Sequence, residues 1–309
     1  MEPEKPTIAR DLPDAPDGAT GWPWVAEPAD FGGGFRAAWP RITIVTPSFQ
    51  QAPYLEACLR SVLLQGYPNL EYIVIDGGSR DGSVDIIARY APFLAFWKSE
   101  TDSGQANAIN QGFTRATGEI VGWINSDDLL LPGALFAVAD AFLSGSAEIV
   151  YGDALNLFEE DDTLQYWQGF WITRPVLRFG GVISSHAVFW RRSVHVPLWE
   201  DLNCSMDQEL WQRLVPGRRM KYLPRPLGVC RQHGESKSSH ERWRERWRQD
   251  DEKIWARHGR PSTNPLFRQW YAKTQRLFKW VSWIRGRAAR RRVLAACGWE
   301  RKGWRGPRP

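Results

Sequence analysis

The stretch Asn125-Ser126-Asp127-Asp128 follows the apolar run Ile120-Val121-Gly122-Trp123-Ile124, and this junction decides the fold prediction. The run has the length and composition of a buried strand, which would place the carboxylates of Asp127 and Asp128 at its carboxyl edge. Ligands bind at that edge in α/β sheets. Adjacent carboxylates repel each other, and a divalent cation carrying a phosphorylated substrate offsets the repulsion. The junction therefore predicts a metal-diphosphate site.

A second interpretation of the same residues is a helix start. Asp128 precedes Leu129-Leu130-Leu131-Pro132. Asp is a favoured N-cap and Pro is tolerated in the first turn of a helix. On this alternative the two acids would have only a local structural role.

The surrounding pattern favours a parallel sheet. Strands are predicted at 41–47, 71–76, 94–97, 120–124 and 148–153, and helices at 54–63, 84–90, 106–116 and 133–143. Strands and helices alternate with polar turns between them, as in βαβ units. We expect one doubly wound α/β domain.

Five strings within this pattern carry a resemblance. They are Val45-Thr46-Pro47-Ser48-Phe49, Ser61-Val62-Leu63-Leu64-Gln65, Val74 to Gly82, Ser99 to Gln105, and Asn125 to Asp128. In this order, over residues 42 to about 128, they resemble the nucleotide-sugar half of family 2 glycosyltransferases. The resemblance implies the GT-A fold, a Rossmann-like, mostly parallel central sheet with flanking helices.

The resemblance implies roles for the donor-side residues. Thr46 and Pro47 would line the base of a nucleoside diphosphate sugar, and Asp76 would hydrogen-bond that base, because an ionised carboxylate only accepts. Gln105, at the end of its string, is also expected to contact the donor. A turn aspartate before two glycines is the structural alternative for Asp76.

The resemblance also implies a cation. Asp127 would contact the donor, and Asp128 would coordinate Mg²⁺ or Mn²⁺ bound to the diphosphate. Hard oxygen ligands suit these ions better than zinc. A cation there stabilises the charge that grows on the departing diphosphate.

Asp207, in Ser205 to Leu214, resembles the residue that the family places at a helix start as general base. It would take the proton of an acceptor hydroxyl attacking the anomeric carbon opposite the leaving group, which inverts that carbon. A helix N-cap or first-turn residue is the alternative. Met206 stands where Glu is frequent, and Glu209 is a weaker substitute for that second acid.

The stretch Arg231 to Ser238 resembles a loop that closes over the diphosphate, with His233 and Lys237 as donor-binding residues. A lone loop histidine is more often simply solvated. The stretch 183–192 is predicted to be a strand near the acceptor, with only a weak indication for His186. Gln50, Gly77 and Asn107 depart from the family pattern, so the donor's identity does not follow from the resemblance.

Composition divides the chain into three parts: an irregular Pro/Gly-rich segment 1–40, a domain 41–239 with halves 41–128 and 129–239, and a tail 240–309. A hydrophobic fraction of 43% and a charged fraction of 24% are typical of a globular protein. Four cysteines without paired metal spacing indicate buried reduced thiols in the cytoplasm. The sequence contains no run of 18 apolar residues, so it predicts no membrane-spanning helix.

The tail carries most of the positive charge. It contains 16 Arg and 4 Lys against 6 acidic residues, a net +14, and because the whole chain is +5, residues 1–239 carry −9. Eight tryptophans also lie there, and 266–284 is predicted to form an amphipathic helix. We expect a C-terminal helical extension that binds an anionic membrane surface from the cytoplasmic side, or packs on the domain. Nucleic acid is a less favoured partner because no recognised motif accompanies the arginines.

Together these observations predict an inverting, metal-dependent glycosyltransferase acting on a hydroxyl of a glycan or lipid-linked acceptor in cell-surface polysaccharide or glycolipid synthesis. A non-catalytic nucleotide-sugar-binding scaffold is the main alternative. A nucleotidyltransferase is less favoured, since residues 48–53 lack a Gly-rich phosphate loop.

Overall fold

The computed structural model describes residues 11–24, 38–169, 174–178, 183–237, 241–299 and 302–305. The strands are β1 (Ile42–Ser48), β2 (Leu70–Asp76), β3 (Phe96–Ser99), β4 (Ile120–Trp123), β5 (Leu129–Leu130), β6 (Ile149–Phe158), β7 (Thr163–Trp167), β8 (Val188–Arg191), β9 (Met220–Gln232) and β10 (Gly303–Trp304). The helices are α2 (Ala52–Leu63), α3 (Ser83–Tyr90), α4 (Gln105–Arg115), α5 (Ala134–Leu143), α6 (Arg174–Leu177), α7 (Met206–Leu214), α8 (Arg244–His258) and α9 (Pro265–Cys297). Short 3-10 turns lie at 91–93, 185–187, 192–194 and 241–243.

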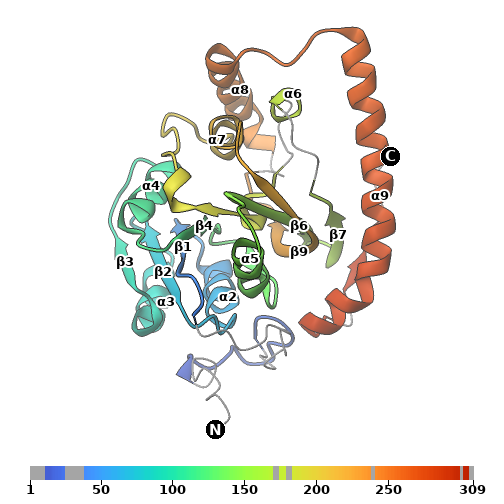
Figure 1. Ribbon diagram of the computed structural model, residues 1–309. Helices are drawn as coiled ribbons and strands as arrows, with labels where there is room; N and C mark the ends of the chain where they lie inside the picture. Colours follow the sequence, from blue (N-terminus) through green and yellow to red (C-terminus); the bar gives the residue numbers. More distant parts are fainter. Residues whose placement is uncertain are drawn as a thin grey trace.

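The strands form one mixed sheet in the order β10-β7-β6-β8-β4-β1-β2-β3, with β9 beside β6 (Figure 1). Strands β3, β2, β1 and β4 are parallel, whereas β8 is antiparallel to both β4 and β6. The strands and helices predicted between residues 41 and 153 are confirmed. The strand predicted at 183–192 is shorter, since 3-10 turns flank β8 on both sides.

The sheet separates two apolar layers. Ile42 and Ile44 of β1 pack with α2 and α5 on one face, while Val45 packs with α4 and α7 on the other. This alternation follows from the two-residue period of a strand. All seven residues of β1 are buried, its two threonines and its serine included, as expected of a strand covered on both faces.

The helix-start interpretation of Asp128 is wrong. Leu129 and Leu130 form β5, which pairs with Val229 and Gly228 of β9. Helix α5 begins only at Ala134, after a left-handed glycine at 133 with a φ of 73°. A short strand therefore follows the acidic pair.

Helix α8 shares the packing of the preceding domain, although its sequence lies beyond the predicted boundary at residue 239. Ile254 is fully buried in the same layer as α7. The buried carboxylate of Asp250 accepts the backbone N–H groups of Asn203, Cys204 and Ser205 at 2.9, 2.6 and 3.1 Å. Asp250 thus holds the segment that leads into α7.

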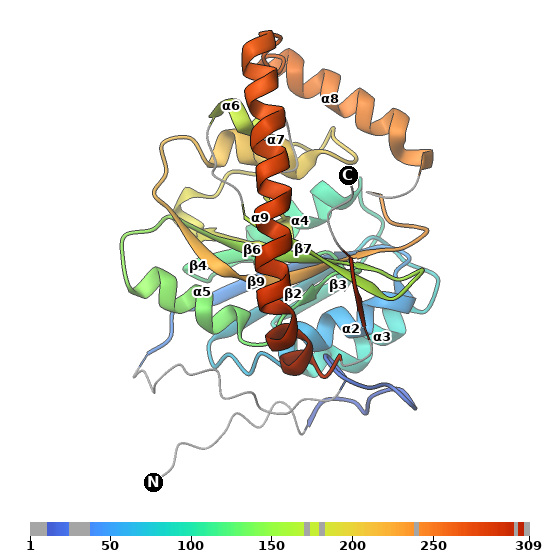
Figure 2. The same cartoon turned by 90° about the vertical axis from the view of Figure 1, so that its right-hand side faces the viewer.

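Helix α9 is longer than predicted and lies along one side of the domain, with its first turns toward α8 (Figures 1 and 2). Arg285 donates to the buried carboxylate of Asp153 at 3.0 Å and to the Tyr222 hydroxyl at 2.5 Å. A Cβ on Gly286 would lie 2.7 Å from the Cβ of Tyr166, so the helix backbone approaches β7 closely. These contacts fix which side of α9 faces the sheet.

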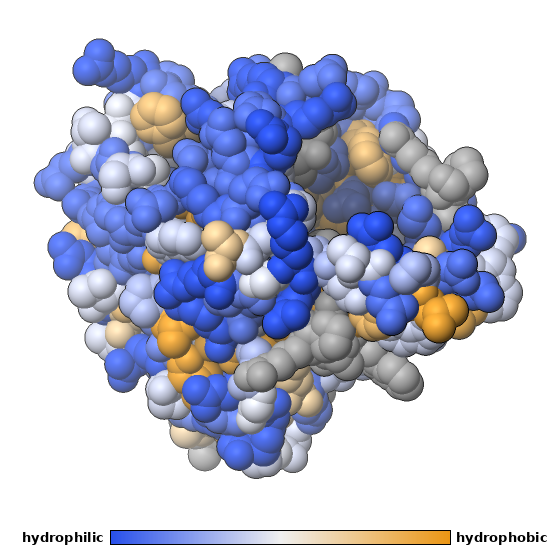
Figure 3. Space-filling model, turned by 90° about the horizontal axis from the view of Figure 1, so that it is seen from above, coloured by the Kyte–Doolittle hydropathy of each residue, from blue (hydrophilic) through white to orange (hydrophobic). Residues whose placement is uncertain are grey.

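The described part of the lead-in, residues 11–24, contains no strand and packs on α2. Buried Arg60 donates to the carbonyls of Pro13 and Pro23. The rest of the lead-in except 38–40 lies outside the described residues. All four cysteines are free, as expected. Among the described helices, none is both long and apolar enough to cross a membrane. Seen from the α8 end, the surface is mostly hydrophilic with separate apolar patches (Figure 3).

Replacing Asp250 with alanine should lower the free energy of unfolding by about 3 kcal/mol, because three backbone N–H groups lose their shared acceptor and unpaired buried donors cost about 1–3 kcal/mol each. Urea unfolding measures the change. The matched control is Asp251→Ala, on the same helix, which should change stability by less than about 0.5 kcal/mol. A loss of stability in Asp250→Ala as small as that in Asp251→Ala would contradict this role of Asp250.

Candidate functional site

The site lies where β1, β2 and β4 end and where β9 brings a distant loop alongside. Pairing of β5 with β9 places residues 231–237 beside the acidic pair, about a hundred residues earlier in sequence. The carboxyl ends of parallel strands meet at one edge of a sheet, as the sequence indicated. The antiparallel β5–β9 contact completes this edge with groups from the second half of the domain.

One hydrogen-bond chain connects three of the predicted motifs. Lys237 Nζ donates to Gln105 Oε1 at 2.9 Å, Gln105 Nε2 donates to Asn125 Oδ1 at 2.8 Å, and Asn125 Nδ2 donates to Asp128 Oδ2 at 3.1 Å. Burial lowers the pKa of the Lys237 ammonium. Gln105 and Lys237 therefore lie together with the acidic pair.

Asp127 and His233 face each other. The Asp127 carboxylate lies 3.3 Å from His233 Nε2, and its side chain is 21% exposed against 3% for the imidazole. Tyr54 stacks on His233 with ring centres 4.1 Å apart. Arg231 donates to the backbone carbonyls of Asp127 and Tyr54. The Asp127 carboxylate is a hard oxygen ligand of the kind that suits Mg²⁺ or Mn²⁺, and the imidazole adds a softer nitrogen donor beside it.

Asp128 is more enclosed than its neighbour, with a side chain only 3% exposed. It accepts the Arg231 N–H at 3.2 Å and lies 3.6 Å from His186 Nδ1. Burial, followed by repulsion from Asp127, raises the pKa of Asp128 well above its ordinary value. The ligand atoms of Asp128, His186 and Cys230 lie within 4.8 Å of one another, a donor set with soft sulfur and nitrogen that suits a metal such as zinc.

His186 itself is buried behind the acidic pair. Burial lowers the pKa of its imidazole to about 4, so the ring is neutral near pH 7. Its Nε2 atom has no hydrogen-bond partner among the described residues. His186 therefore lies beside Asp128, and the weak indication that it lies near an acceptor stays a prediction.

Asp76 is the last residue of β2, before the turn, and its carboxylate accepts hydrogen bonds from several protein donors. It accepts the N–H groups of Gly78 and Ser79 at 3.1 and 2.8 Å and the hydroxyls of Ser79 and Ser99 at 2.6 and 2.7 Å. The residue is fully buried. Three of these four hydrogen bonds reach Oδ2 and one reaches Oδ1, a geometry that matches the turn interpretation of Asp76, while its contact with a nucleotide base stays a prediction.

Thr46 and Pro47 are also enclosed. Thr46 is fully buried, and its hydroxyl lies 3.0 Å from the Tyr72 hydroxyl. Pro47 is buried as well. Neither side chain presents a solvent-facing surface in this structure.

Asp102 is a candidate that the sequence interpretation missed, although it lies within one of the quoted strings. A Cβ on Gly77 would lie 3.1 Å from Asp102 Oδ2, so the carboxylate fills the space left where the family pattern often has an acid. Asp102 is partly exposed, and burial followed by repulsion from Asp76 raises its pKa. The replacement of Asp by Gly77 was the signal that could have pointed to it.

Asp207 lies in the first turn of α7, as predicted, and is partly exposed. Its Oδ1 accepts the Gln208 N–H at 2.7 Å, while desolvation raises its pKa to about 6. Lys237 donates to the carbonyl of Asn203 at 2.8 Å, which connects the start of α7 to the donor-side chain of hydrogen bonds. Asp207 thus follows a segment that Lys237 contacts, and its role as a general base stays a prediction.

The other α7 candidates face inward. Met206 is buried in the core, and Glu209 is fully buried and pairs with Arg213 and His258 at 2.6 and 2.9 Å. Glu209 is therefore engaged structurally rather than as a second acid for an acceptor.

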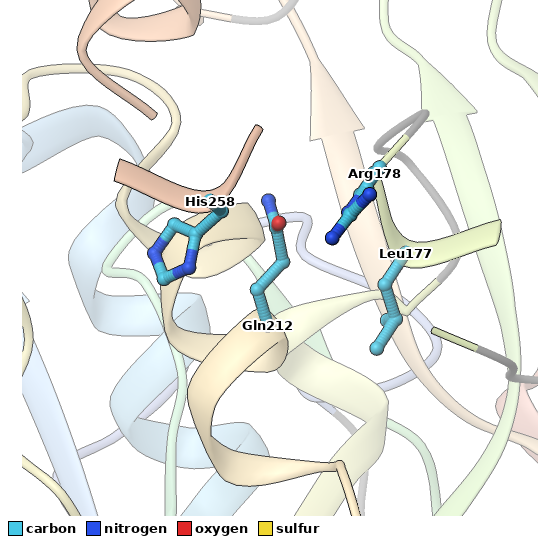
Figure 4. A pocket seen from close by; sticks show the side chains of 4 residues that line it. All are labelled: Leu177, Arg178, Gln212 and His258. Carbon is cyan, nitrogen blue, oxygen red and sulfur yellow. The ribbon is translucent and has the colours of Figure 1, made fainter. Parts of the chain in front are cut away.

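A separate pocket adjoins α7 and α8. Leu177, Arg178, Gln212 and His258 line it, with the His258 and Arg178 side chains on opposite sides of Gln212 (Figure 4). None of the predicted site residues belongs to this lining. The pocket is accordingly distinct from the edge that carries Asp127.

Comparisons with known proteins match this chain to glycosyltransferases. Residues 43–187 match the model of glycosyl transferase family 2. The PGL/p-HBAD biosynthesis glycosyltransferase of Mycobacterium tuberculosis is 31% identical over 160 residues, 50% of this chain and 60% of that protein. An uncharacterized glycosyltransferase of the same species is 35% identical over 111 residues, 36% of this chain and 42% of that protein. The chain thus spans about half the length of these relatives.

Two solved structures share the fold. The mannosyltransferase PcManGT from Pyrobaculum calidifontis, in complex with GDP-Man and Mn²⁺, has a TM-score of 0.53 and 21% identity over 92% of this chain and 79% of that one. S. aureus TarS, in complex with UDP-GlcNAc, has a TM-score of 0.53 and 15% identity over 70% of this chain and 66% of that one. At these identities the likeness concerns the fold alone.

Replacing Asp76 with alanine should lower the free energy of unfolding by about 3 kcal/mol or more, because buried donors in the turn lose their acceptor. Urea unfolding measures it. The partly exposed Asp102→Ala is the matched control and should cost less than about 1 kcal/mol. If Asp76→Ala kept full stability but lost nucleotide binding, the base-contact role predicted from the sequence would hold instead.

Proposed function

Because this chain belongs to glycosyltransferase family 2 and has the GT-A fold, we propose that it transfers a sugar from a nucleoside diphosphate sugar to an acceptor hydroxyl with inversion of the anomeric carbon. The observation that carries the proposal is the convergence at one sheet edge of the Asp127–His233 pair, the Lys237 ammonium and the start of α7 with Asp207. This arrangement supports a site in which the donor-binding residues and a general base act together.

On the donor side, the proposal assigns the contact with the nucleotide base to the partly exposed Asp102 rather than to Asp76, which is fully buried and accepts four protein hydrogen bonds. Thr46 and Pro47 then shape the floor through the backbone of β1, while Gln105 orients Lys237. The Lys237 ammonium is placed to bind a diphosphate oxygen by a charge-assisted hydrogen bond.

For the cation, the proposal moves the ligand role from Asp128 to its neighbour. A cation that also binds a diphosphate needs an open side, and Asp127 is exposed where Asp128 is enclosed. Asp127 and His233 would hold Mg²⁺ or Mn²⁺, which when bound offsets the negative charge on the leaving diphosphate. Asp128 would orient Asn125 and the Arg231 backbone from behind.

Asp207 would act as general base. As the acceptor oxygen forms its bond to the anomeric carbon, the bond to the diphosphate oxygen breaks and the hydroxyl proton moves to the Asp207 carboxylate. A pKa of about 6 keeps this carboxylate ionised near pH 7 while raising its affinity for the proton. Attack from the face opposite the leaving group inverts the carbon.

The acceptor class is proposed more broadly, as a glycan or lipid-linked hydroxyl in cell-surface polysaccharide or glycolipid synthesis. Two observations support this class: a relative named for PGL/p-HBAD biosynthesis, and a basic, tryptophan-rich tail suited to an anionic membrane surface. In this arrangement the enzyme would act on the cytoplasmic side as a peripheral protein. A non-catalytic donor-binding scaffold is the alternative, favoured if Asp207 proves dispensable.

Asp127→Asn should weaken Mn²⁺-dependent binding of a nucleoside diphosphate by about tenfold to a hundredfold, because the exposed carboxylate is lost as a ligand. Calorimetric titration of GDP and UDP, with and without Mn²⁺, measures it. Asp128→Asn is the matched variant and should bind within a few fold of wild type. The reverse order would transfer the cation to Asp128 with His186 and Cys230.

Lowering the pH should slow transfer at saturating donor by about tenfold per pH unit below 6, because protonated Asp207 cannot accept the acceptor's proton. The rate should level off above that pKa.

Asp207→Asn should keep nucleotide binding and lose transfer, as measured by release of nucleoside diphosphate in the presence of acceptor. Normal transfer by Asp207→Asn would exclude it as the base.

A further inference from the structure

Helix α9 has two faces of different character. The inner face is fixed on the domain through Arg285, Gly286 and the buried residues Ser282, Val293 and Cys297. At its far end, Trp299 Nε1 donates to the carbonyl of Trp22, which joins the end of the helix to the N-terminal segment. The helix therefore cannot rotate freely to hide its outer face.

The outer face carries a stripe of exposed apolar side chains. Among the described residues, seven large hydrophobic side chains are exposed, and five of them lie on α9: Leu266, Trp270, Leu277, Trp280 and Ile284, with exposed fractions of 76%, 51%, 59%, 55% and 41%. Successive members are 4, 7, 3 and 4 residues apart, so they share one side of a helix with 3.6 residues per turn. This concentration on one helix is unlike the scattered exposure expected of a soluble surface.

The stripe lies opposite the docked face. Ile284 and Leu266 are 18 residues apart, five turns of the helix, and so project on the same side. Ser282 and Gly286 stand two residues before and after Ile284, about half a turn or more around the helix in each direction. A single orientation of α9 on the domain therefore explains why Ser282 and Gly286 are buried while Ile284 is exposed.

The charge around the stripe is of one sign. Residues 265–297 contain nine Lys and Arg and no Asp or Glu. Eight of these basic residues are exposed, namely Arg268, Lys273, Arg276, Lys279, Arg287, Arg290, Arg291 and Arg292. Lys273 lies seven residues before Trp280, so basic and indole groups occupy the same strip of surface.

We propose that this outer face of α9 is a docking surface for an anionic lipid membrane. Tryptophan and leucine suit the boundary between headgroups and acyl chains, and flanking lysines and arginines suit negative headgroups. A second copy of the chain is the weaker occupant, because two such faces would bring like charges together. This proposal identifies the part of the tail through which the membrane association in the proposed function would occur. Binding of the membrane by α9 does not require sugar transfer.

The test uses the full chain and vesicle co-sedimentation, comparing phosphatidylcholine vesicles with vesicles that also contain phosphatidylglycerol. Wild type should bind the anionic vesicles, and added salt should weaken binding. The double variant Trp270→Gln, Trp280→Gln should bind these vesicles at least about tenfold more weakly than wild type. Both tryptophans are exposed, so circular dichroism and urea unfolding should remain as in wild type.

The matched control is Leu143→Gln, which removes an exposed hydrophobic side chain of α5 and should bind as wild type does. A charge variant, Lys273→Glu with Arg276→Glu, should lose the preference for anionic vesicles. Wild-type failure to bind these vesicles, or undiminished binding of the double tryptophan variant, would overturn the proposal. So would self-association without lipid that the tryptophan changes abolish. None of these readouts involves sugar transfer, so failure here is distinguishable from failure of the proposed activity.

Discussion

The pairing of the two-residue strand β5 with β9 is the contact on which the candidate site depends. It directs the chain after Asp128 into the sheet and brings Arg231 and His233 beside the acidic pair. Asp127 and His233 lie 106 residues apart, and β9, which β6 also holds along its length, carries His233 to the acidic pair. Backbone hydrogen bonds are directional, so even a short ladder sets the register of the loops that follow it.

Carboxylates in this domain divide by what surrounds them. Asp76, Asp153 and Asp250 are buried and accept several protein donors, so they hold turns and helices in place. Asp127 and Asp207 keep some exposure. A buried carboxylate needs its hydrogen bonds satisfied by the protein, whereas one that binds substrate must keep an accessible oxygen. This distinction identifies Asp76, Asp153 and Asp250 as structural acids and is consistent with the roles proposed for Asp127 and Asp207.

Helix α9 connects stability and surface chemistry. One side is fixed by the Arg285–Asp153 pair beneath Tyr222, and this attachment determines which residues remain outside. An amphipathic pattern by itself cannot tell whether indoles pack inward or face solvent. In this protein Trp270 and Trp280 on the helix are exposed, whereas Trp299, two residues beyond its end, is buried.

Much of this protein was determined by local sequence. Apolar runs and polar turns predict the strands and helices between residues 41 and 153, since the periods of burial are local properties. The motif strings also indicated the family, and with it the edge where Asp127 and Asp207 lie. The sequence left open whether Asp76 holds its turn or contacts a base, and the local hydrogen bonds from Gly78 and Ser79, with a distant one from Ser99, match the turn role. Only tertiary structure decided that Asp102 fills the space beside Gly77 and that Asp250 holds the start of α7. These two contacts join residues far apart in the chain, and no local pattern encodes the hydrogen bonds that distant residues will satisfy.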